Sequence, residues 1–340
     1  MKKDSLILLD QFSRPLSDLR ISITDKCNFR CVYCMPKEIF GADYQYLAKS
    51  DLLTYEEIVR LVSIMMNFGV TKVRITGGEP LLRNDVDVLI SMLAKNSDLD
   101  LTLTTNGAFL TKEKSQNLME AGLKRITVSL DSLDDETFNK LNDVNFSVEN
   151  VLKGISNASS VGFSPIKINM VVMRSVNLSS VVPMALYFKD KGHIVRFIEY
   201  MDVGDTNGWK LDEVVSSAEI VSLIGAQAPL EPVQPNYVGE VANRWKYLDG
   251  SGEIGVISSV TQPFCGNCSR LRLSAKGELF TCLFASSGHD ISSLLRSQAT
   301  DQHIADCIAS IWHMRNDRYS ELRNIKSHDL NRIEMSYIGG

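Results

Sequence analysis

The chain has 340 residues, of which 44% are hydrophobic and 23% charged, with a formal net charge of -5. This length leaves room for two average domains or for one large α/β barrel with an appendage, and the apolar content excludes a disordered chain. The acidic balance offers no general basic field to nucleic acid or an anionic membrane, and no apolar run reaches 18 residues. The apolar run before Asp10 is too short for a signal peptide, so we expect a cytoplasmic protein that binds neither nucleic acid nor membrane.

Six strand-like runs rich in β-branched residues alternate with helical patterns over the first two thirds of the chain. The runs cover residues 19–24, 72–76, 101–105, 125–131, 166–173 and 195–201. Residues 54–69 repeat apolar side chains at helical spacing and stop at Gly69. This alternation is typical of βαβ units and a parallel sheet, in which ligands bind at the carboxyl ends of the strands. We predict a partial (β/α)6 TIM-like barrel, with every motif below at or just past such an end.

The first cysteine set is Cys27, Cys31 and Cys34, which follow the first strand with the spacing C-x3-C-x2-C. In a reducing compartment, clustered thiols are more often metal ligands or redox groups than disulfides. A tetrahedral zinc site needs a fourth ligand, but no further Cys or His lies within 150 residues of Cys34. A four-iron cluster held by three thiolates leaves one iron open to a small molecule, and this is the cluster we predict.

After residue 205 the pattern changes to a segment rich in Pro and Gly, then to short strands, and a helical pattern returns around 301–316. We predict a barrel domain over residues 1–215 and a C-terminal region over 216–340 that closes the barrel mouth. Cys307 lies on the apolar face of the 301–316 helix, and we interpret it as a core thiol.

The second cysteine set, Cys265, Cys268 and Cys282, again offers three ligands without a fourth. His289 is the only histidine nearby, and we interpret it as a surface loop residue. Six of the seven cysteines therefore divide into two sets of three. A second cluster with an open iron is what a substrate-binding cluster requires, so we predict an iron–sulfur region in the C-terminal part.

The first motif, with Tyr33 before its third cysteine, resembles the radical S-adenosylmethionine superfamily. The segment "GGEP" at 77–80, directly after the second strand, strengthens the resemblance. It implies that S-adenosylmethionine chelates the open iron and that the GGEP segment holds its methionine amino group. The residue types agree, because paired glycines let the backbone approach a ligand and Glu79 can accept from an ammonium group.

Seven segments taken together resemble the molybdenum cofactor biosynthesis protein A family, the GTP 3',8-cyclases. In the family's order they are "FSRPLSDLRISITDKCNFRCVYCMP", "RITGGEPLLR", "TTNG", "RITVSLD", "RFIEYMDVG", "FCGNCSRLRLS" and "MSYIGG". The chain departs at Ser13, where Gly often precedes the arginine, and at "RSVN", where the family commonly has Gly before the hydrophobic residue. Neither departure removes a charged or ligating group.

The resemblance implies a role for each matching position. Those for S-adenosylmethionine are Tyr33, Gly77, Gly78, Glu79, Ser129 and Met201. Those for GTP are Arg14, Arg74, Thr105, Lys167, Arg270, Leu271 and Arg272, and Arg196, which also lies in a strand, is a further candidate. Arg270 and Arg272, together with Gly339 and Gly340 of a tail inside the barrel, are the expected catalytic residues. Charges inside core strands are costly unless paired, and a triphosphate would pair those of Arg74 and Lys167.

The resemblance implies a lyase of molybdenum cofactor biosynthesis that converts GTP to 3',8-cyclo-7,8-dihydro-GTP after a hydrogen is taken from ribose C3'. Its cofactors would be two [4Fe-4S] clusters and S-adenosylmethionine. Its partners would be an external electron donor such as flavodoxin and a downstream cyclic pyranopterin monophosphate synthase, and a homodimer is left open.

Two other functions remain open at this point. A twin-cluster radical enzyme that modifies a peptide would share the first motif, but a typical auxiliary domain needs a larger C-terminal cysteine set. A noncatalytic metal-binding scaffold predicts four-ligand sites and has no need for GGEP.

Overall fold

A single twelve-stranded sheet runs through the part of the chain that the computed structural model describes, residues 7–323 and 331–339. The strand order is β12-β11-β10-β1-β2-β3-β4-β5-β6-β9-β8-β7. The strands are β1 (Asp18–Ser22), β2 (Lys72–Thr76), β3 (Asp100–Thr105), β4 (Arg125–Ser129), β5 (Lys167–Val172), β6 (Ile194–Glu199), β7 (Leu230–Val233), β8 (Asn243–Tyr247), β9 (Glu253–Ile257), β10 (Arg270–Leu273), β11 (Glu278–Phe280) and β12 (His289–Asp290). The six predicted strands are confirmed as β1 to β6, with ends shifted by at most two residues.

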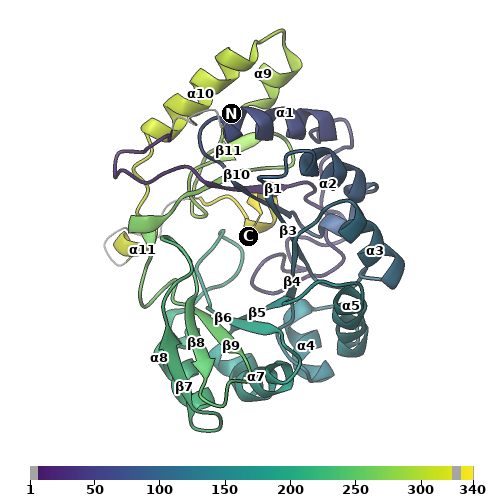
Figure 1. Cartoon of the computed structure of the whole chain (residues 1–340), viewed down its shortest axis with the longest axis vertical. Coiled ribbons are helices and arrows are strands. Elements are labelled where there is room, and N and C mark those ends of the chain that lie inside the picture. Colours follow the sequence, from purple (N-terminus) through teal and green to yellow (C-terminus); the bar gives the residue numbers. More distant parts are fainter. Residues whose placement is uncertain (1–6, 324–330, 340) are drawn as a thin grey trace.

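The helices of the first half lie along one side of the strands (Figure 1). They are α1 (Tyr55–Met66), α2 (Val86–Ala94), α3 (Lys112–Glu120), α4 (Asp135–Asn142) and α5 (Val148–Ser160). The later helices are α6 (Arg174–Asn177), α7 (Val181–Lys189), α8 (Ser217–Gly225), α9 (Ser292–Arg296), α10 (Asp301–His313), α11 (Tyr319–Leu322) and α12 (Met335–Ile338). None of the helices in the described residues is long and apolar enough to cross a membrane.

Local sequence explains where α1 begins and ends. The hydroxyl of Thr54 accepts from the Glu57 amide at 3.1 Å, and the Glu57 carboxylate accepts from the Thr54 amide at 2.7 Å, which makes a capping box. The apolar face of the helix is buried, and the chain leaves the helix before Gly69, whose φ is +99°. The helix predicted over 54–69 is therefore confirmed.

The C-terminal part of the chain enters the barrel sheet on both sides. Strand β10 pairs with β1 in parallel, and β9 pairs with β6 in parallel. The α/β class and the mostly parallel sheet are confirmed. The division at residue 215 stays a prediction, and strands from both sides of it share this one sheet.

Alternation along the strands sends apolar and polar side chains to opposite faces. Leu19 and Ile21 of β1, and Val73 and Ile75 of β2, are fully buried in the main apolar cluster together with the inner faces of the helices. The residues between them, including Arg20, point to the other face of the sheet. The inner face of the barrel is therefore polar, and the core lies between sheet and helices.

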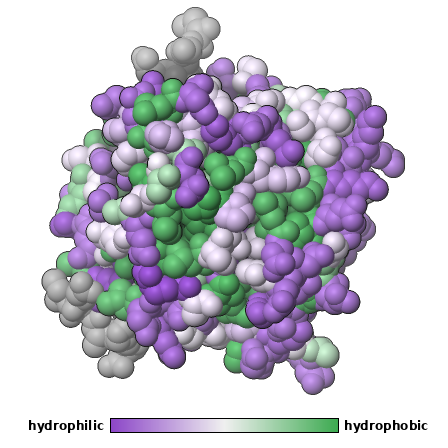
Figure 2. Space-filling model, turned by 90° about the horizontal axis from the view of Figure 1, so that it is seen from below, coloured by the Kyte–Doolittle hydropathy of each residue, from purple (hydrophilic) through white to green (hydrophobic). Residues whose placement is uncertain are grey.

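The molecular surface seen from the side of α7 and α8 carries apolar areas bordered by polar side chains (Figure 2). Exposed apolar side chains of these two helices include Leu186, Tyr187 and Leu223. Their exposure is ordinary for a folded domain, because apolar atoms make up much of any protein surface.

Candidate active site

The first cysteine set lies in the loop after β1 and is fixed by its main chain. The amides of Arg30 and Val32 donate to the carbonyls at the end of α4 at 2.8 and 2.9 Å. The Arg30 guanidinium donates to the Cys27 carbonyl at 2.8 Å. Burial raises the pKa of the Cys27 thiol to about 11, and burial together with the nearby Cys27 and Cys34 thiols raises the pKa of Cys31 well above its usual value. The three thiols therefore lie close together in a half-buried loop.

Within residues 7–323 and 331–339, no three His, Cys, Asp or Glu side chains converge in the way that a single metal ion requires. Three thiols in one half-buried loop are a donor set that suits a four-iron cluster, because each of three thiolates binds a different iron.

The GGEP segment pairs with the residues that lead into Cys27. The amide of Gly78 donates to the Thr24 carbonyl at 2.8 Å, and that of Glu79 to the Lys26 carbonyl at 2.8 Å. A Cβ on Gly78 would lie 2.3 Å from the Lys26 carbonyl oxygen, so only glycine allows this approach. Main-chain hydrogen bonds therefore hold the GGEP segment next to the start of the cysteine loop.

Glu79 joins the ends of β2 and β3. Its carboxylate is buried and accepts from the Thr105 hydroxyl at 2.7 Å, the Leu81 amide at 3.0 Å and the Asn106 amide at 2.7 Å. Burial raises the pKa of Glu79 to about 7 despite these bonds. That Glu79 accepts from the ammonium group of the cofactor stays a prediction. The hydrogen bond from Thr105 to Glu79 shows that this threonine faces the GGEP segment.

The other residues predicted for S-adenosylmethionine gather at the same edge of the sheet. Ser129 ends β4, Met201 follows β6, and both are half-buried. The Tyr33 hydroxyl donates to Asp131 at 2.7 Å, and the other oxygen of Asp131 accepts from the Val171 amide at 2.8 Å. This pair fixes the Tyr33 ring between the cysteine loop and the end of β4.

The second cysteine set lies at the opposite end of the barrel. Cys265 and Cys268 precede β10, which runs parallel to β1, and Cys282 follows β11, which runs antiparallel to β10. The expectation that every motif lies at a carboxyl end is therefore correct for the first set and wrong for the second. The reason is that Cys265 and Cys268 come before β10 in the chain and therefore lie at the amino end of a strand that is parallel to β1.

Three arginines form one row across the inner face of the sheet between the two ends. Arg272 of β10 pairs with Arg20 of β1, which pairs with Arg74 of β2. Side chains at paired positions of parallel strands share a face, so all three point into the barrel. Arg74 donates to the Thr104 hydroxyl at 2.9 Å and, like Arg196 of β6, to the Thr127 hydroxyl at 3.3 Å.

Positive charge in the barrel exceeds the negative charge that faces it. Burial, with Arg272 and Arg270 nearby, holds the pKa of Arg20 well below its usual range. Burial also lowers the pKa of Lys167 to about 8 and that of Arg196 to about 9. In the described residues the Nε atoms of Arg20, Arg74 and Arg196 are buried without a hydrogen-bond partner. A polyanion would satisfy both the charge and these donors.

If Lys167 contacts GTP, as the resemblance implies, affinity for GTP should fall as pH rises from 7 to 9, because burial lowers the pKa of Lys167 to about 8 and only its charged form attracts an anion. We expect roughly a three- to tenfold rise in the Kd of the reconstituted protein. Lys167→Arg should remove most of that rise, because a guanidinium loses its proton at higher pH than an ammonium group, and Arg196, with a pKa of about 9, should leave a smaller rise in both proteins. Equilibrium dialysis with GTP measures this. Equal pH slopes for the two proteins would assign the effect to other groups.

Arg20 and Thr104 are the interior residues that the sequence interpretation missed. Alternation along β1 and β3 was the signal, because Arg20 lies in register with Arg74, and Thr104 lies one residue before the threonine that was chosen. Thr105 instead contacts Glu79. Arg14 lies outside the barrel row and contacts the second cysteine segment, and its Nη2 is buried without a partner in the described residues, so its contact with GTP stays a prediction. Leu271 is buried in the apolar cluster and faces away from the arginine row.

The C-terminal tail reaches the arginine row. The Gly339 carbonyl accepts from Nη1 of Arg272. Gly339 has φ +71°, and a Cβ there would lie 2.5 Å from Cγ2 of Thr76. Gly339 therefore occupies a space that no other residue fits. Gly340, also predicted to be catalytic, lies outside the described residues.

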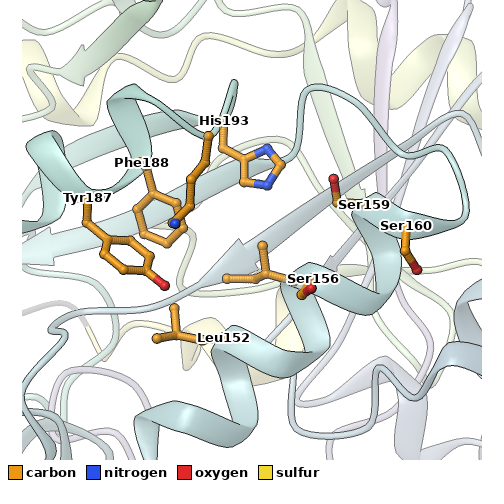
Figure 3. A pocket seen from close by; sticks show the side chains of 9 residues that line it. Leu152, Ser156, Ser159, Ser160, Tyr187, Phe188 and His193 are labelled. Atoms are coloured by element: carbon orange, nitrogen blue, oxygen red, sulfur yellow. The ribbon is translucent and has the colours of Figure 1, made fainter.

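Two cavities complete the description. One of about 450 Å³ lies between α5 and α7, where Ser156, Tyr187 and His193 line it, and it contains none of the predicted site residues (Figure 3). The other, of about 280 Å³, is lined by Cys282, His289 and Asp317 and opens onto the second cysteine set. His289 is exposed, as expected, and Cys307 packs against the core from α10.

The fold and the first cysteine loop define a radical S-adenosylmethionine enzyme. The sequence model of the Radical SAM superfamily matches residues 21–188, and that of Molybdenum Cofactor Synthesis C matches residues 193–321. The GTP 3',8-cyclase of Acidothermus cellulolyticus is 51% identical, with 97% of this chain and 98% of the relative covered. That of Staphylococcus epidermidis is 46% identical, with 98% and 99% covered. The chain belongs to the GTP 3',8-cyclase family.

Solved structures support the fold assignment. Streptococcus suis SuiB bound to S-adenosylmethionine matches with a TM-score of 0.62 at 15% identity, over 94% of this chain and 70% of that chain. At this identity the similarity shows the fold alone.

Proposed function

We propose that this GTP 3',8-cyclase binds GTP along the arginine row, between two [4Fe-4S] clusters at opposite ends of the barrel, and forms 3',8-cyclo-7,8-dihydro-GTP. The observation that carries the proposal is the row Arg272, Arg20 and Arg74, which lies in register between the two cysteine sets, with Arg272 and Arg74 buried and Arg20 half-buried. Buried guanidinium groups with free donors are suited to phosphate oxygens. GTP is the polyanion on which the enzymes of this family act.

The first site holds S-adenosylmethionine at the carboxyl ends of the strands. Bound there, the cluster and S-adenosylmethionine supply the one-electron chemistry that creates a hydrogen-abstracting species. The main chain of Gly77 and Gly78, and the half-buried Ser129 and Met201, line the cofactor site. Tyr33, fixed by Asp131, closes its side. These residues orient the cofactor toward the arginine row and exclude water from it.

The second site is the set Cys265, Cys268 and Cys282, which we propose to hold the substrate-binding cluster. All three thiols are half-buried. Burial alone would raise the pKa of Cys268, but Arg270 and Arg315 outweigh it and lower that pKa to about 6. A thiol that ionises readily is a ready metal ligand. The cavity at Cys282 gives iron a path into the site.

Arg270, Arg272 and the glycine tail are the residues that we propose to align the substrate. Arg270 and Arg272 alternate on β10, so both face the barrel. The Arg272 bond to the Gly339 carbonyl fixes one guanidinium next to Arg20. The substrate then contacts side chains that are already held in one rotamer, and in this way the barrel wall orients the substrate.

The partners that we propose follow from family membership. An external one-electron donor, flavodoxin or similar, would reduce the first cluster, and a cyclic pyranopterin monophosphate synthase would take the product onward. We place this pathway in the cytoplasm, where thiol ligands stay reduced. A homodimer is compatible with the proposal.

Replacing Cys265, Cys268 and Cys282 together by alanine should remove about half of the iron and sulfide and leave S-adenosylmethionine binding intact, because only one of two clusters is lost. Iron and sulfide analysis of anaerobically reconstituted protein, with equilibrium dialysis of the cofactor, measures both. The matched control replaces Cys307, a thiol of α10, by alanine and should retain all of its iron. Full iron content in the triple variant would contradict the second cluster.

A further inference from the structure

A buried triad of two arginines and one aspartate lies beside the second cysteine set. One Asp10 oxygen accepts from Nε of Arg14 at 2.6 Å and from Nη1 of Arg315 at 3.1 Å. Its other oxygen accepts from the amides of Phe12 and Arg14, both at 2.9 Å. The three side chains are exposed by 2% or less. The Asp317 carboxylate also lies 3.6 Å from Nε of Arg315, so two carboxylates face the two guanidinium groups.

The two guanidinium groups hold the main chain of all three ligand segments. Nη1 of Arg14 donates to the Cys265 carbonyl at 2.8 Å. Nη1 of Arg315 donates to the Cys268 carbonyl at 2.7 Å, and its Nε donates to the carbonyl of Thr281, the residue before Cys282, at 3.1 Å. The separate loops whose thiolates would bind one cluster are therefore hydrogen-bonded to the same buried triad.

Residues from distant parts of the chain hold this triad in place. Asp10 and Arg14 precede β1, whereas Arg315 follows α10. The Trp312 indole donates to the Arg14 carbonyl at 3.1 Å, and the Arg315 guanidinium lies 4.5 Å from the centre of the Trp312 ring. Arg14 also donates to the Asp317 carbonyl at 2.8 Å. The N-terminal segment thereby becomes part of a site whose ligands lie some 250 residues later.

We propose that Asp10, Arg14 and Arg315 are positioning residues that prepare the second cysteine set to receive iron, and that the charges of the two arginines raise the reduction potential of the second cluster. This inference rests on the proposed second cluster. Both guanidinium groups donate to carbonyls of the ligand segments, so their charges lie next to the place where three thiolates and their cluster add negative charge. Groups that orient metal ligands typically change metal affinity by about 10- to 100-fold when removed. Positive charge near a cluster favours its reduced form.

The first test measures iron retention at the second site alone. Cys27, Cys31 and Cys34 are replaced by alanine, so that all bound iron reports the second set. In this background Arg14→Lys and Arg315→Lys keep the charge but lose the forked donors that reach two carbonyls. Arg60→Gln is the matched control, because Arg60 anchors the other end of α10 to α1 through Asp301 at 2.7 Å and contacts no cysteine segment. Iron loss to a chelator and the thermal midpoint are recorded for each protein.

Both lysine variants should lose iron about tenfold faster than the background protein, and Arg60→Gln should match the background. Iron loss that merely follows the thermal midpoint across the three variants would reduce the triad to a structural ion pair and overturn the proposal. Equal rates in all four proteins would overturn it too. A background protein that binds no iron at all would instead contradict the proposed second cluster.

The second test measures the potential, which packing alone would not move. Arg315→Gln removes one buried positive charge, so the reduction potential of the second cluster should become more negative in a titration followed by electron paramagnetic resonance. Arg315→Lys, which keeps the charge, should shift it less. An unchanged potential in Arg315→Gln would contradict the electrostatic half of the proposal, and it can be read from whatever fraction of the variant retains its cluster.

Discussion

Arg20→Met should lower kcat/KM for GTP about 100-fold, with iron content and S-adenosylmethionine binding unchanged. Arg20 lies in the middle of the row, in register with Arg272 on one side and Arg74 on the other. Its Nε is buried without a partner in the described residues, so its donors are free for the substrate. A hydrogen bond to a charged group contributes about 1.5 to 3 kcal/mol, and two such bonds to phosphate correspond to at least a 100-fold effect.

The same variant should unfold at an equal or higher temperature than the wild type in the absence of GTP. Its charge is repelled by Arg272 and Arg270, and replacing a buried charge by an apolar side chain is often neutral or stabilising. Arg272→Ala should likewise lower kcat/KM at least tenfold. Arg174→Met, which removes an exposed arginine paired with Glu219, is the control and should keep full activity. Wild-type kinetics for both Arg20→Met and Arg272→Ala would refute GTP binding along the row.

Deleting Gly339 and Gly340 should abolish most GTP-dependent formation of 5'-deoxyadenosine while both clusters and the thermal midpoint are preserved. The deletion removes the carbonyl that accepts from Arg272, so this guanidinium loses its fixed position in the row. Gly339→Ala should act almost as strongly, because its φ is +71° and its Cβ would lie 2.5 Å from Cγ2 of Thr76. Misplacing a group in an oriented site by an ångström can cost about 100-fold in rate.

Tyr337→Phe is the matched control for the tail. It removes only the hydroxyl that donates to Glu278 and leaves the glycines in place, so activity should stay within about threefold of the wild type. Chromatography of 5'-deoxyadenosine with and without GTP measures all three variants. An undiminished rate in the deletion variant would leave the tail as an ordinary chain end.

Local sequence signals were sufficient for the barrel strands. Alternating β-branched runs and capped amphipathic helices each report on their own neighbourhood, and β1 to β6 were predicted within two residues. The place of β10 was not predictable in this way. Its four residues give no local sign that they pair in parallel with β1, about 250 residues earlier, and this long-range pairing decides at which end of the barrel Cys265 and Cys268 lie.

The site was predictable where spacing carries the chemistry. The cysteine spacing and the GGEP segment can be identified without knowing where each side chain points. Identifying the basic residues inside the barrel requires knowing which face of the sheet each strand residue occupies. Arg20 satisfies the argument that supported Arg74, a charge inside an apolar strand, but the resemblance implied no role for Arg20. Thr104 and Thr105 differ by one residue, which in a strand reverses the face, so Thr104 contacts Arg74 whereas Thr105 contacts Glu79. The contacts of Arg14 with Asp10 and with the Cys265 carbonyl become visible only in three dimensions, and its contact with GTP stays a prediction.

The measurement that tests the central claim most directly follows one hydrogen atom. Anaerobically reconstituted protein is given S-adenosylmethionine, a reductant and GTP deuterated at ribose C3', and the products are analysed by mass spectrometry. If the barrel holds GTP between the two sites as proposed, 5'-deoxyadenosine should carry one deuterium, and it should form together with a GTP-derived product cyclised between C3' and C8. Unlabelled 5'-deoxyadenosine, formed at the same rate with ATP or without any nucleotide, would contradict the account.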